Sequence, residues 1–203
     1  MIARWSQGRP PAAFAEASAP REGGRYGGPP KGGPYKRGPY KRGPLETNVI
    51  TQNVDDLHVR AGTRGLIRLH GSLWELRCGN VGAAFRRPAC EGSWRDESVP
   101  LVEFPPHCRP CGSLARPAIV WFGEPLAAAD VEAAISACSC DVFVTIGTSA
   151  IVFPAAGLVQ HARTEGAFTA EINLQPTSAS AVVDLSILGA AEDILPALDR
   201  LLD

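Results

Sequence analysis

From residue 48 onwards, short apolar runs alternate with stretches in which apolar residues recur at helical spacing. The short runs predict strands at 48–51, 65–70, 118–122, 141–146 and 167–172. The helical spacing predicts helices at 126–138, 154–165 and 191–202, the second opened by a proline and the third interrupted by one. Strands that alternate with helices are typical of a parallel sheet with helices on both faces. The pattern therefore predicts an α/β fold with a Rossmann-like, doubly wound parallel sheet.

Residues 1–46 have a different composition. They contain eight Pro and nine Gly, and they have few large apolar side chains to offset the entropy of ordering the chain. This segment carries nine Lys and Arg against three Glu, whereas residues 47–203 carry eleven against eighteen acidic residues. We therefore expect a basic, disordered tail at 1–46 and one folded domain at 47–203.

The tail contains a short repeat. The pentapeptide Gly-Pro-Tyr-Lys-Arg occurs at 33–37 and again at 38–42. Basic residues interleaved with tyrosine suit weak nucleic-acid binding by charge and stacking. A solvated linker accounts for the same composition, since charge runs are usually solvated. A nucleic-acid partner is therefore not expected.

The segment 78–116 lacks clear periodicity and is rich in Arg, Pro and Gly. Four cysteines occur in it, which predicts a small module inserted in the α/β core: Cys78, Cys90, Cys108 and Cys111. Six Cys in a chain of 203 residues, two of them as Cys-x-x-Cys, favour metal ligation in a reducing compartment over a disulfide scaffold. We expect an intracellular protein, with mitochondrial, cytoplasmic and nuclear locations left open. No apolar run approaches the ~20 residues of a membrane span, so no membrane association is expected.

Two nearby stretches carry the residue types that hold a ribose and move a proton. Residues 51–58 read Thr-Gln-Asn-Val-Asp-Asp-Leu-His, and residues 69–72 read Leu-His-Gly-Ser. The first stretch follows a predicted buried strand, and parallel strands deliver side chains into a cleft at their carboxyl ends. An amide, a carboxylate and an imidazole in this order suit binding of a ribose and general base catalysis.

These two motifs resemble those of the sirtuins, a family of NAD-dependent protein-lysine deacylases, and the resemblance covers about three quarters of the chain. It implies that His70 is the general base that takes a ribose hydroxyl proton after the acyl-lysine carbonyl oxygen has displaced nicotinamide. It also implies that Gln52, Asn53 and Asp55 contact the nicotinamide ribose and carboxamide, and that Asn53 and Asp55 take part in the chemistry. An Asx turn that caps the following helix is an alternative role for the last two, and both roles can hold at once. His58, on that helix, is expected to be structural.

Two further stretches match the sirtuin pattern on the adenosine side of the cofactor. Gly147, Thr148 and Ser149 follow a predicted buried strand, where a glycine lets backbone amides approach a ribose or pyrophosphate. Asn173 matches the family asparagine that bonds the adenosine ribose, with a strand-terminating turn as the alternative. NAD is therefore the expected cofactor.

Residues 116–124 resemble the sirtuin segment that pairs with the substrate backbone and walls the acyl-lysine tunnel. The segment is most similar to the class III sirtuins, the desuccinylase and demalonylase type. The resemblance implies acyl-lysine protein substrates as partners and leaves the oligomeric state open. The implied substrate contacts are Val120, Trp121, Phe122, Gly123 and Glu124.

The chain departs from the sirtuin pattern at the expected zinc site. A sirtuin zinc is held by two Cys-x-x-Cys pairs, but Val81 stands where the first pair has its second cysteine. Cys90 is the candidate for the missing thiolate. His107 is disfavoured because its neighbour Cys108 should already be a ligand. We therefore expect zinc on Cys78, Cys108 and Cys111, with Cys90 as the candidate fourth ligand.

A second departure concerns residues 1–47, in which nothing matches the sirtuin glycine-rich loop that cradles the cofactor pyrophosphate. We therefore expect part of the NAD site to be missing, together with the residues that select the acyl group. The resemblance implies an NAD-dependent protein-lysine deacylase that transfers the acyl group to ADP-ribose and releases nicotinamide. The alternative is a truncated, catalytically impaired sirtuin that binds acyl-lysine or NAD.

Overall fold

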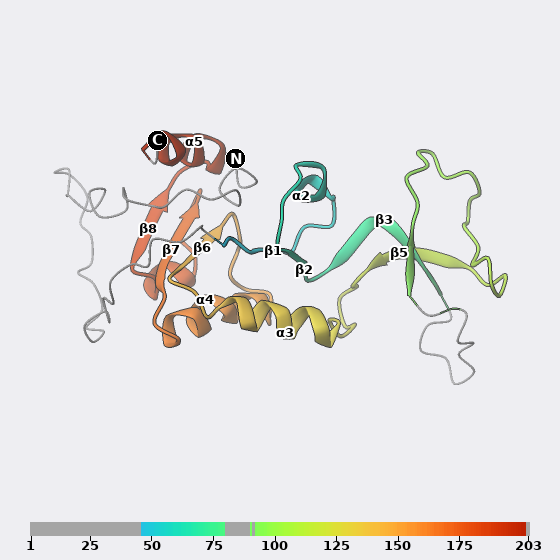
Figure 1. Cartoon of the computed structure of the whole chain (residues 1–203), viewed down its shortest axis with the longest axis horizontal. Helices are drawn as coiled ribbons and strands as arrows, with labels where there is room; N and C mark the ends of the chain where they lie inside the picture. The colour runs from blue at the N-terminus through green and yellow to red at the C-terminus, as the bar shows by residue number, and fades with distance from the viewer. Residues whose placement is uncertain (1–45, 80–89, 91, 202–203) are drawn as a thin grey trace. The chain divides into compact units, whose positions relative to one another are not determined.

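The computed structural model describes residues 46–79, 90 and 92–201, and the chain divides into two compact units (Figure 1). One unit spans Val49–Asp130, and the other contains the residues from Val131 onwards. The expected tail, including its two pentapeptide repeats, lies outside the described residues except for Glu46. The domain boundary at residue 46 therefore stays a prediction.

The Val49–Asp130 unit begins with a pair of parallel strands. β1 (Val49–Thr51) pairs with β2 (Leu66–Arg68), and the short helix α2 (Leu57–Arg60) lies between them in sequence. The register places Thr51 opposite Arg68, so both strands end at the same edge. The polar residues that follow the two strands therefore lie next to each other at this edge of the sheet, as expected for parallel strands.

A three-stranded antiparallel sheet follows in the same unit. Its order is β4 (Ser93–Arg95), β3 (Gly71–Cys78) and β5 (Ala115–Ile119). Gly71 opens β3 with a φ of 76°, and a Cβ at this position would lie 2.0 Å from the carbonyl oxygen of Ala118. Only glycine fits here, because any side chain would collide with the β5 backbone.

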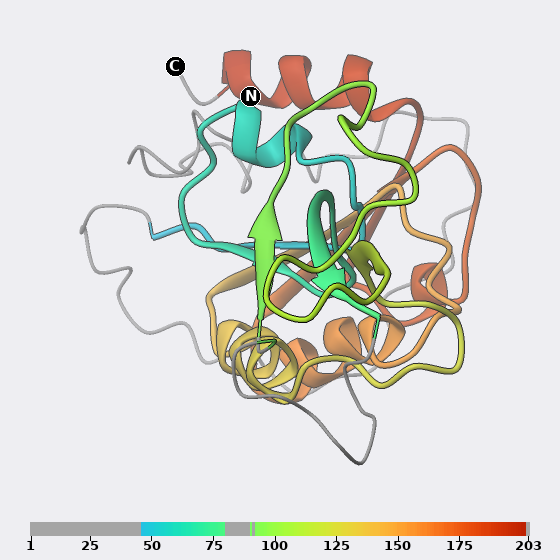
Figure 2. The same cartoon turned by 90° about the vertical axis from the view of Figure 1, so that its right-hand side faces the viewer.

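The second unit contains a parallel sheet between helices. Its order is β6 (Val142–Ile146), β7 (Phe168–Asn173) and β8 (Leu185–Leu188). The helices α4 (Ala155–Thr164) and α5 (Ala191–Leu201) lie on opposite faces of this sheet, as both views show (Figures 1 and 2). The helix α3 (Ala128–Ala137) precedes β6, and a 3-10 turn, η3 (Ala179–Ala181), precedes β8. None of the helices in the described part of the chain is long and apolar enough to cross a membrane.

The core of this second unit centres on β7. Its buried residues are Thr169, Ala170, Glu171 and Ile172, and α4 packs Leu158, Val159 and Ala162 against the sheet. A central parallel strand is covered on both faces, so its side chains are buried without the in-and-out alternation of a surface strand. The carboxylate of Glu171 is accommodated because Thr177, Ser180 and Ser186 donate hydrogen bonds to it.

The expected α/β fold with parallel, Rossmann-like sheets is confirmed, but several strands differ from the expectation. The strand expected at 118–122 lies earlier in the chain, because β5 runs from Ala115 to Ile119 and is followed by a turn. In that turn the Glu124 N–H donates to the Trp121 carbonyl at 2.9 Å, and Gly123 has a φ of 87°. The sequence pattern also did not predict β3, β4 or β8, in which polar residues interrupt the apolar positions.

Candidate active site and metal centre

His70 lies in the turn between β2 and β3, and three hydrogen bonds hold it and the preceding Leu69 in place. The Leu69 N–H before it donates to the Thr51 carbonyl at 3.0 Å, and the Val120 N–H donates to the His70 carbonyl at 3.0 Å. The ring Nδ1 lies 3.0 Å from the carbonyl oxygen of Gln52. The sirtuin-like motifs at 51–58 and 69–72 are therefore in direct contact.

The contact between His70 and Gln52 determines the tautomer of the imidazole. A carbonyl oxygen only accepts hydrogen bonds, so the His70 Nδ1 must carry the proton that it donates. In the neutral ring the lone pair then lies on Nε2. A half-buried imidazole whose ring orientation is fixed and whose Nε2 carries the lone pair has the geometry of a general base.

The residues after β1 form a tight turn into α2. The Asn53 N–H donates to the Thr51 side-chain oxygen at 3.1 Å, and the Asp55 Oδ1 accepts from the Leu57 N–H at 2.9 Å. The turn that was the alternative role for Asp55 is therefore present. Asn53 is exposed and Asp55 is half-buried, so the turn leaves the Asn53 side chain open to a ligand. Whether Gln52, Asn53 and Asp55 contact a cofactor stays a prediction.

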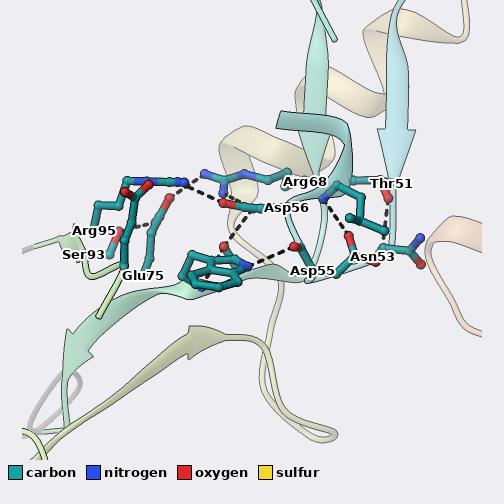
Figure 3. Close-up of polar contacts among 12 residues, drawn as sticks. Thr51, Asn53, Asp55, Asp56, Arg68, Glu75, Ser93 and Arg95 are labelled. Carbon is teal, nitrogen blue, oxygen red and sulfur yellow. Dashed lines mark hydrogen bonds and ion pairs between the residues drawn. The ribbon is translucent and has the colours of Figure 1, made fainter. Parts of the chain in front are cut away.

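The next residue, Asp56, is the site residue that sequence reasoning missed. It is buried, with a φ of 60°, and its carboxylate accepts hydrogen bonds from Ser72, Arg68 and Arg95 (Figure 3). Burial alone would raise its pKa, but the hydrogen bonds from Ser72, Arg95 and Arg68 outweigh burial and lower the pKa below the usual range. Asp56 is therefore ionised at neutral pH.

Four cysteine side chains converge at the far end of the antiparallel sheet: Cys78, Cys90, Cys108 and Cys111. Their sulfur atoms all lie within 4.8 Å of one another. Cys78 is the last residue of β3, and Cys108 and Cys111 lie in a turn closed by the Gly112 N–H, which donates to the Cys108 carbonyl at 2.7 Å. The predicted cluster is thus present, with Cys90 in the fourth position.

The spacing of these sulfurs fits a tetrahedral metal. Four sulfurs bound to one zinc at ~2.3 Å lie about 3.8 Å apart. The Sγ atoms of Cys78 and Cys111 are 3.6 Å apart, and those of Cys108 and Cys90 are 3.9 Å apart. His107 is not part of the cluster, because its Nδ1 pairs instead with Glu103 at 2.8 Å. The four thiols therefore fit zinc without a fifth ligand; Val81 lies outside the described residues.

The segment 120–124 presents two aromatic side chains to solvent. Trp121 is 53% exposed and Phe122 is 97% exposed. The Glu124 carboxylate, by contrast, forms ion pairs with Arg77 at 2.7 Å and with Arg116. Glu124 therefore fixes the turn, and of the expected substrate contacts the two aromatic residues are those whose side chains are most open.

In the second unit, the ends of β6 and β7 meet as expected. The Gly147 N–H donates to the Ile172 carbonyl at 2.9 Å, and the Asn173 side-chain amide donates to the Thr148 carbonyl at 2.7 Å. Gly147 has a φ of 61°, and the turn continues through Ser149 to Ala150, which has a φ of 54°. The structure thus brings 147–149 and Asn173 together, and their contact with NAD stays a prediction.

Known proteins resemble this chain over most of its length. The Sir2 family model matches residues 41–154. The NAD-dependent protein deacylase 2 of Pyrobaculum aerophilum is 43% identical over 151 residues, which is 74% of this chain and 57% of that protein. The NAD-dependent protein deacylase of Mycobacterium tuberculosis is 46% identical over 152 residues, or 74% of this chain and 62% of that protein. The chain therefore spans about three fifths of the length of these relatives.

Solved structures of Sir2 homologues also resemble this chain. The crystal structure of a Sir2 homologue–NAD complex superimposes with a TM-score of 0.70 at 40% identity, covering 77% of this chain and 58% of the other. The structure of Sir2Af2 bound to a myristoylated histone peptide superimposes with a TM-score of 0.64 at 36% identity, covering 77% and 65%. The family model, the relatives and the solved structures agree with one another, and the chain belongs to the Sir2 family.

Proposed function

We propose that this chain is an NAD-dependent protein-lysine deacylase in which His70 is the general base. The observation that carries the proposal is the hydrogen bond from the His70 Nδ1 to the Gln52 carbonyl, which leaves Nε2 as the proton acceptor. Two relatives that are 43% and 46% identical are named NAD-dependent protein deacylases, which supports the same activity here.

In this proposal NAD supplies the ADP-ribosyl group that receives the acyl group, and nicotinamide is released. The candidates for contact with the nicotinamide side of the cofactor are Gln52, Asn53 and Asp55, and the candidates for the adenosine side are Gly147–Ser149 and Asn173. The His70 Nε2 takes a proton from a ribose hydroxyl. The solved Sir2 homologue with bound NAD supports the choice of cofactor.

The substrate is proposed to be an acyl-lysine in an extended protein segment. The solved relative with a myristoylated histone peptide supports this class. The exposed Trp121 and Phe122 offer apolar surface for the acyl-lysine side chain. The similarity of 116–124 to class III sirtuins makes succinyl- and malonyl-lysine the acyl groups to try beside acetyl-lysine.

We also propose that the four-cysteine centre holds a structural zinc. Four thiolates complete a tetrahedral site and leave no open position for catalysis. All six cysteines are free thiols, which supports the proposal of a reducing, intracellular location.

The test is nicotinamide release from NAD by the purified chain in the presence of acetyl- or succinyl-lysine peptide. Release should depend on the peptide and fall by about 10²–10⁴-fold in His70→Ala, the range of a general base. His58→Ala, on the neighbouring helix α2, is the control and should retain activity. Micromolar NAD binding by calorimetry without nicotinamide release would reject the enzyme and favour a cofactor-binding module.

A further inference from the structure

The Asp56 carboxylate lies between residues on both sides of His70. Its Oδ1 accepts from the Arg68 Nη1 at 3.1 Å and from the Ser72 hydroxyl at 2.8 Å, and these residues stand two positions before and two positions after His70. Its Oδ2 accepts from the Arg95 Nη1 at 2.9 Å. Figure 3 shows the two guanidinium groups pointing toward this one carboxylate from β2 and β4.

Backbone contacts join the same two segments. Gln52 accepts from His70, and the Val54 carbonyl accepts from the Leu73 N–H at 2.9 Å. The Asp55 carbonyl accepts from the Trp74 Nε1 at 2.9 Å. Residues 51–56 are thus attached to residues 68–74 along their whole length, and Asp56 provides the ionic contacts of this attachment.

The Asp56 carboxylate is costly to lose because it is buried together with Ser72. The Asp56 side chain is 1% exposed, and Ser72 is fully buried. Without the carboxylate, the Ser72 hydroxyl would lose its acceptor, and Arg68 and Arg95 would lose a shared anionic partner. Buried groups without partners force the surrounding backbone to shift or admit water. Either change would act on the turn that holds the His70 ring.

Arg95 connects this network to the four-cysteine centre. It is the last residue of β4, and the preceding residue, Trp94, packs against the cluster that contains Cys78, Cys90 and Cys108. Successive side chains of a strand point to opposite faces, so β4 directs Trp94 to the cysteines and Arg95 to Asp56. A second carboxylate strengthens the link, because Glu75 accepts from Arg68 and from Ser93 of β4, each at 2.7 Å.

We propose that Asp56 is a positioning residue that fixes the orientation and tautomer of His70, and that Arg95 makes this positioning depend on the state of the four-cysteine centre. The proposal rests on the proposed function only in taking His70 as the base. The proposal couples the four-cysteine centre to His70 within one unit. A metal bound to the cysteines orders β4, and ordered β4 positions Arg95 against the Asp56 carboxylate, which contacts the residues on both sides of His70.

The first experiment follows the His70 ring directly. In the ¹⁵N-labelled full chain, a long-range ¹H–¹⁵N correlation spectrum, assigned with His70→Ala, should show a single Nδ1–H tautomer for His70. Asp56→Asn should give a mixture of tautomers and at least about tenfold slower nicotinamide release at saturating NAD, since small displacements of catalytic groups cost rate steeply. Glu97→Gln removes the other, exposed partner of Arg95 and is the matched control. It should change neither the spectrum nor the rate.

Two results separate positioning from general stabilisation. If Asp56→Asn lowers the melting temperature but keeps the single Nδ1–H tautomer, the positioning role is wrong. If the wild-type chain releases no nicotinamide while the tautomer still changes in Asp56→Asn, the proposed function fails and the positioning role stands. Should Asp56→Asn not fold, Arg95→Gln is the second variant, because its side chain is 43% exposed and Asp56 keeps Arg68 and Ser72.

The second experiment tests the coupling. Zinc-loaded and chelator-treated samples of the wild-type chain and of Arg95→Gln are compared by the same spectrum. Removing the metal should shift the His70 ring signals in the wild type and leave them unchanged in Arg95→Gln. Equal shifts in both proteins, or none in either, would overturn the coupling through Arg95.

Discussion

The sulfur atoms of Cys78 and Cys111 lie 3.6 Å apart although 33 positions separate them in the sequence. This distance is close to the edge of a zinc–thiolate tetrahedron, about 3.8 Å. The last strand residue of β3 and the turn at 108–112 are therefore arranged as ligands of one ion. The pKa of Cys111 is lowered to about 6 by hydrogen bonds from Ser113 and from Cys90, which favours a thiolate there.

We predict that the purified chain contains about one zinc ion and that Cys90→Ser loses most of it. Three thiolates and a water hold zinc more weakly than four thiolates do. Zinc content by mass spectrometry and the melting temperature with and without chelator are the measurements. Cys140→Ser, outside the cluster, is the control and should keep its zinc. Equal zinc content in both variants would remove Cys90 from the ligand set.

We predict that Gly71→Ala destabilises the chain far more than Gly62→Ala. The two glycines have nearly the same φ, 76° and 71°, so both substitutions carry the same strain of about 1–2 kcal/mol. Only at position 71 would the new methyl group meet backbone, 2.0 Å from the Ala118 oxygen, whereas position 62 is open. The free energies of unfolding in urea should differ by at least about 2 kcal/mol. Similar free energies of unfolding for the two variants would mean that the β5 backbone moves at Ala118 to make room for the methyl group.

Strands β1, β2, β6 and β7 were predictable because each contains a contiguous run of apolar residues, whereas β3, β4 and β8 were not predicted. Residues 142–146 and 168–173 are examples, and the polar residues that end them form the expected turns. The contact between His70 and Gln52, by contrast, was seen only in the structure, where the strands that precede them pair in parallel.

The Asp56 network was not predictable, because its members are distant in sequence and each looks ordinary by itself. Asp56 follows Asp55 and precedes a helix, where an acidic residue usually caps the helix in solvent. Its partners Arg68 and Arg95 are 12 and 39 positions away. Likewise, Glu124 suggested a polar residue beside the substrate, but Arg77, 47 positions earlier, binds its carboxylate. Such pairings depend on tertiary structure and leave no local signal.

We predict that Asp56 stabilises the fold in a pH-dependent manner. Its pKa in the folded chain lies below the value of about 3.9 for an unfolded aspartate. Its ionic contribution is therefore complete above about pH 5 and is lost as the pH falls through the folded pKa. Asp56→Asn should lower the free energy of unfolding by at least about 2 kcal/mol at pH 7, and the difference from wild type should shrink below about pH 4.

Urea unfolding between pH 3 and pH 7 measures this dependence. Glu132→Gln, an exposed position on α3, is the control and should follow the wild-type curve. A gap between Asp56→Asn and wild type that stays constant down to pH 3 would show that the carboxylate contributes through shape and not through charge.

The last prediction concerns Phe122, whose side chain is 97% exposed at the turn after β5. A large apolar side chain in water contributes almost nothing to folding, so Phe122→Ala should change the free energy of unfolding by less than about 0.5 kcal/mol. If Trp121 and Phe122 form the apolar surface for the acyl-lysine, the same substitution should raise the KM for the acyl peptide several-fold and leave NAD binding unchanged. Phe104→Ala is the matched control, because Phe104 is 87% exposed in the same unit but lies in the segment between the cysteines. It should alter neither stability nor KM. Equal effects of the two substitutions on KM would show that Phe122 is not part of the surface that binds the acyl peptide.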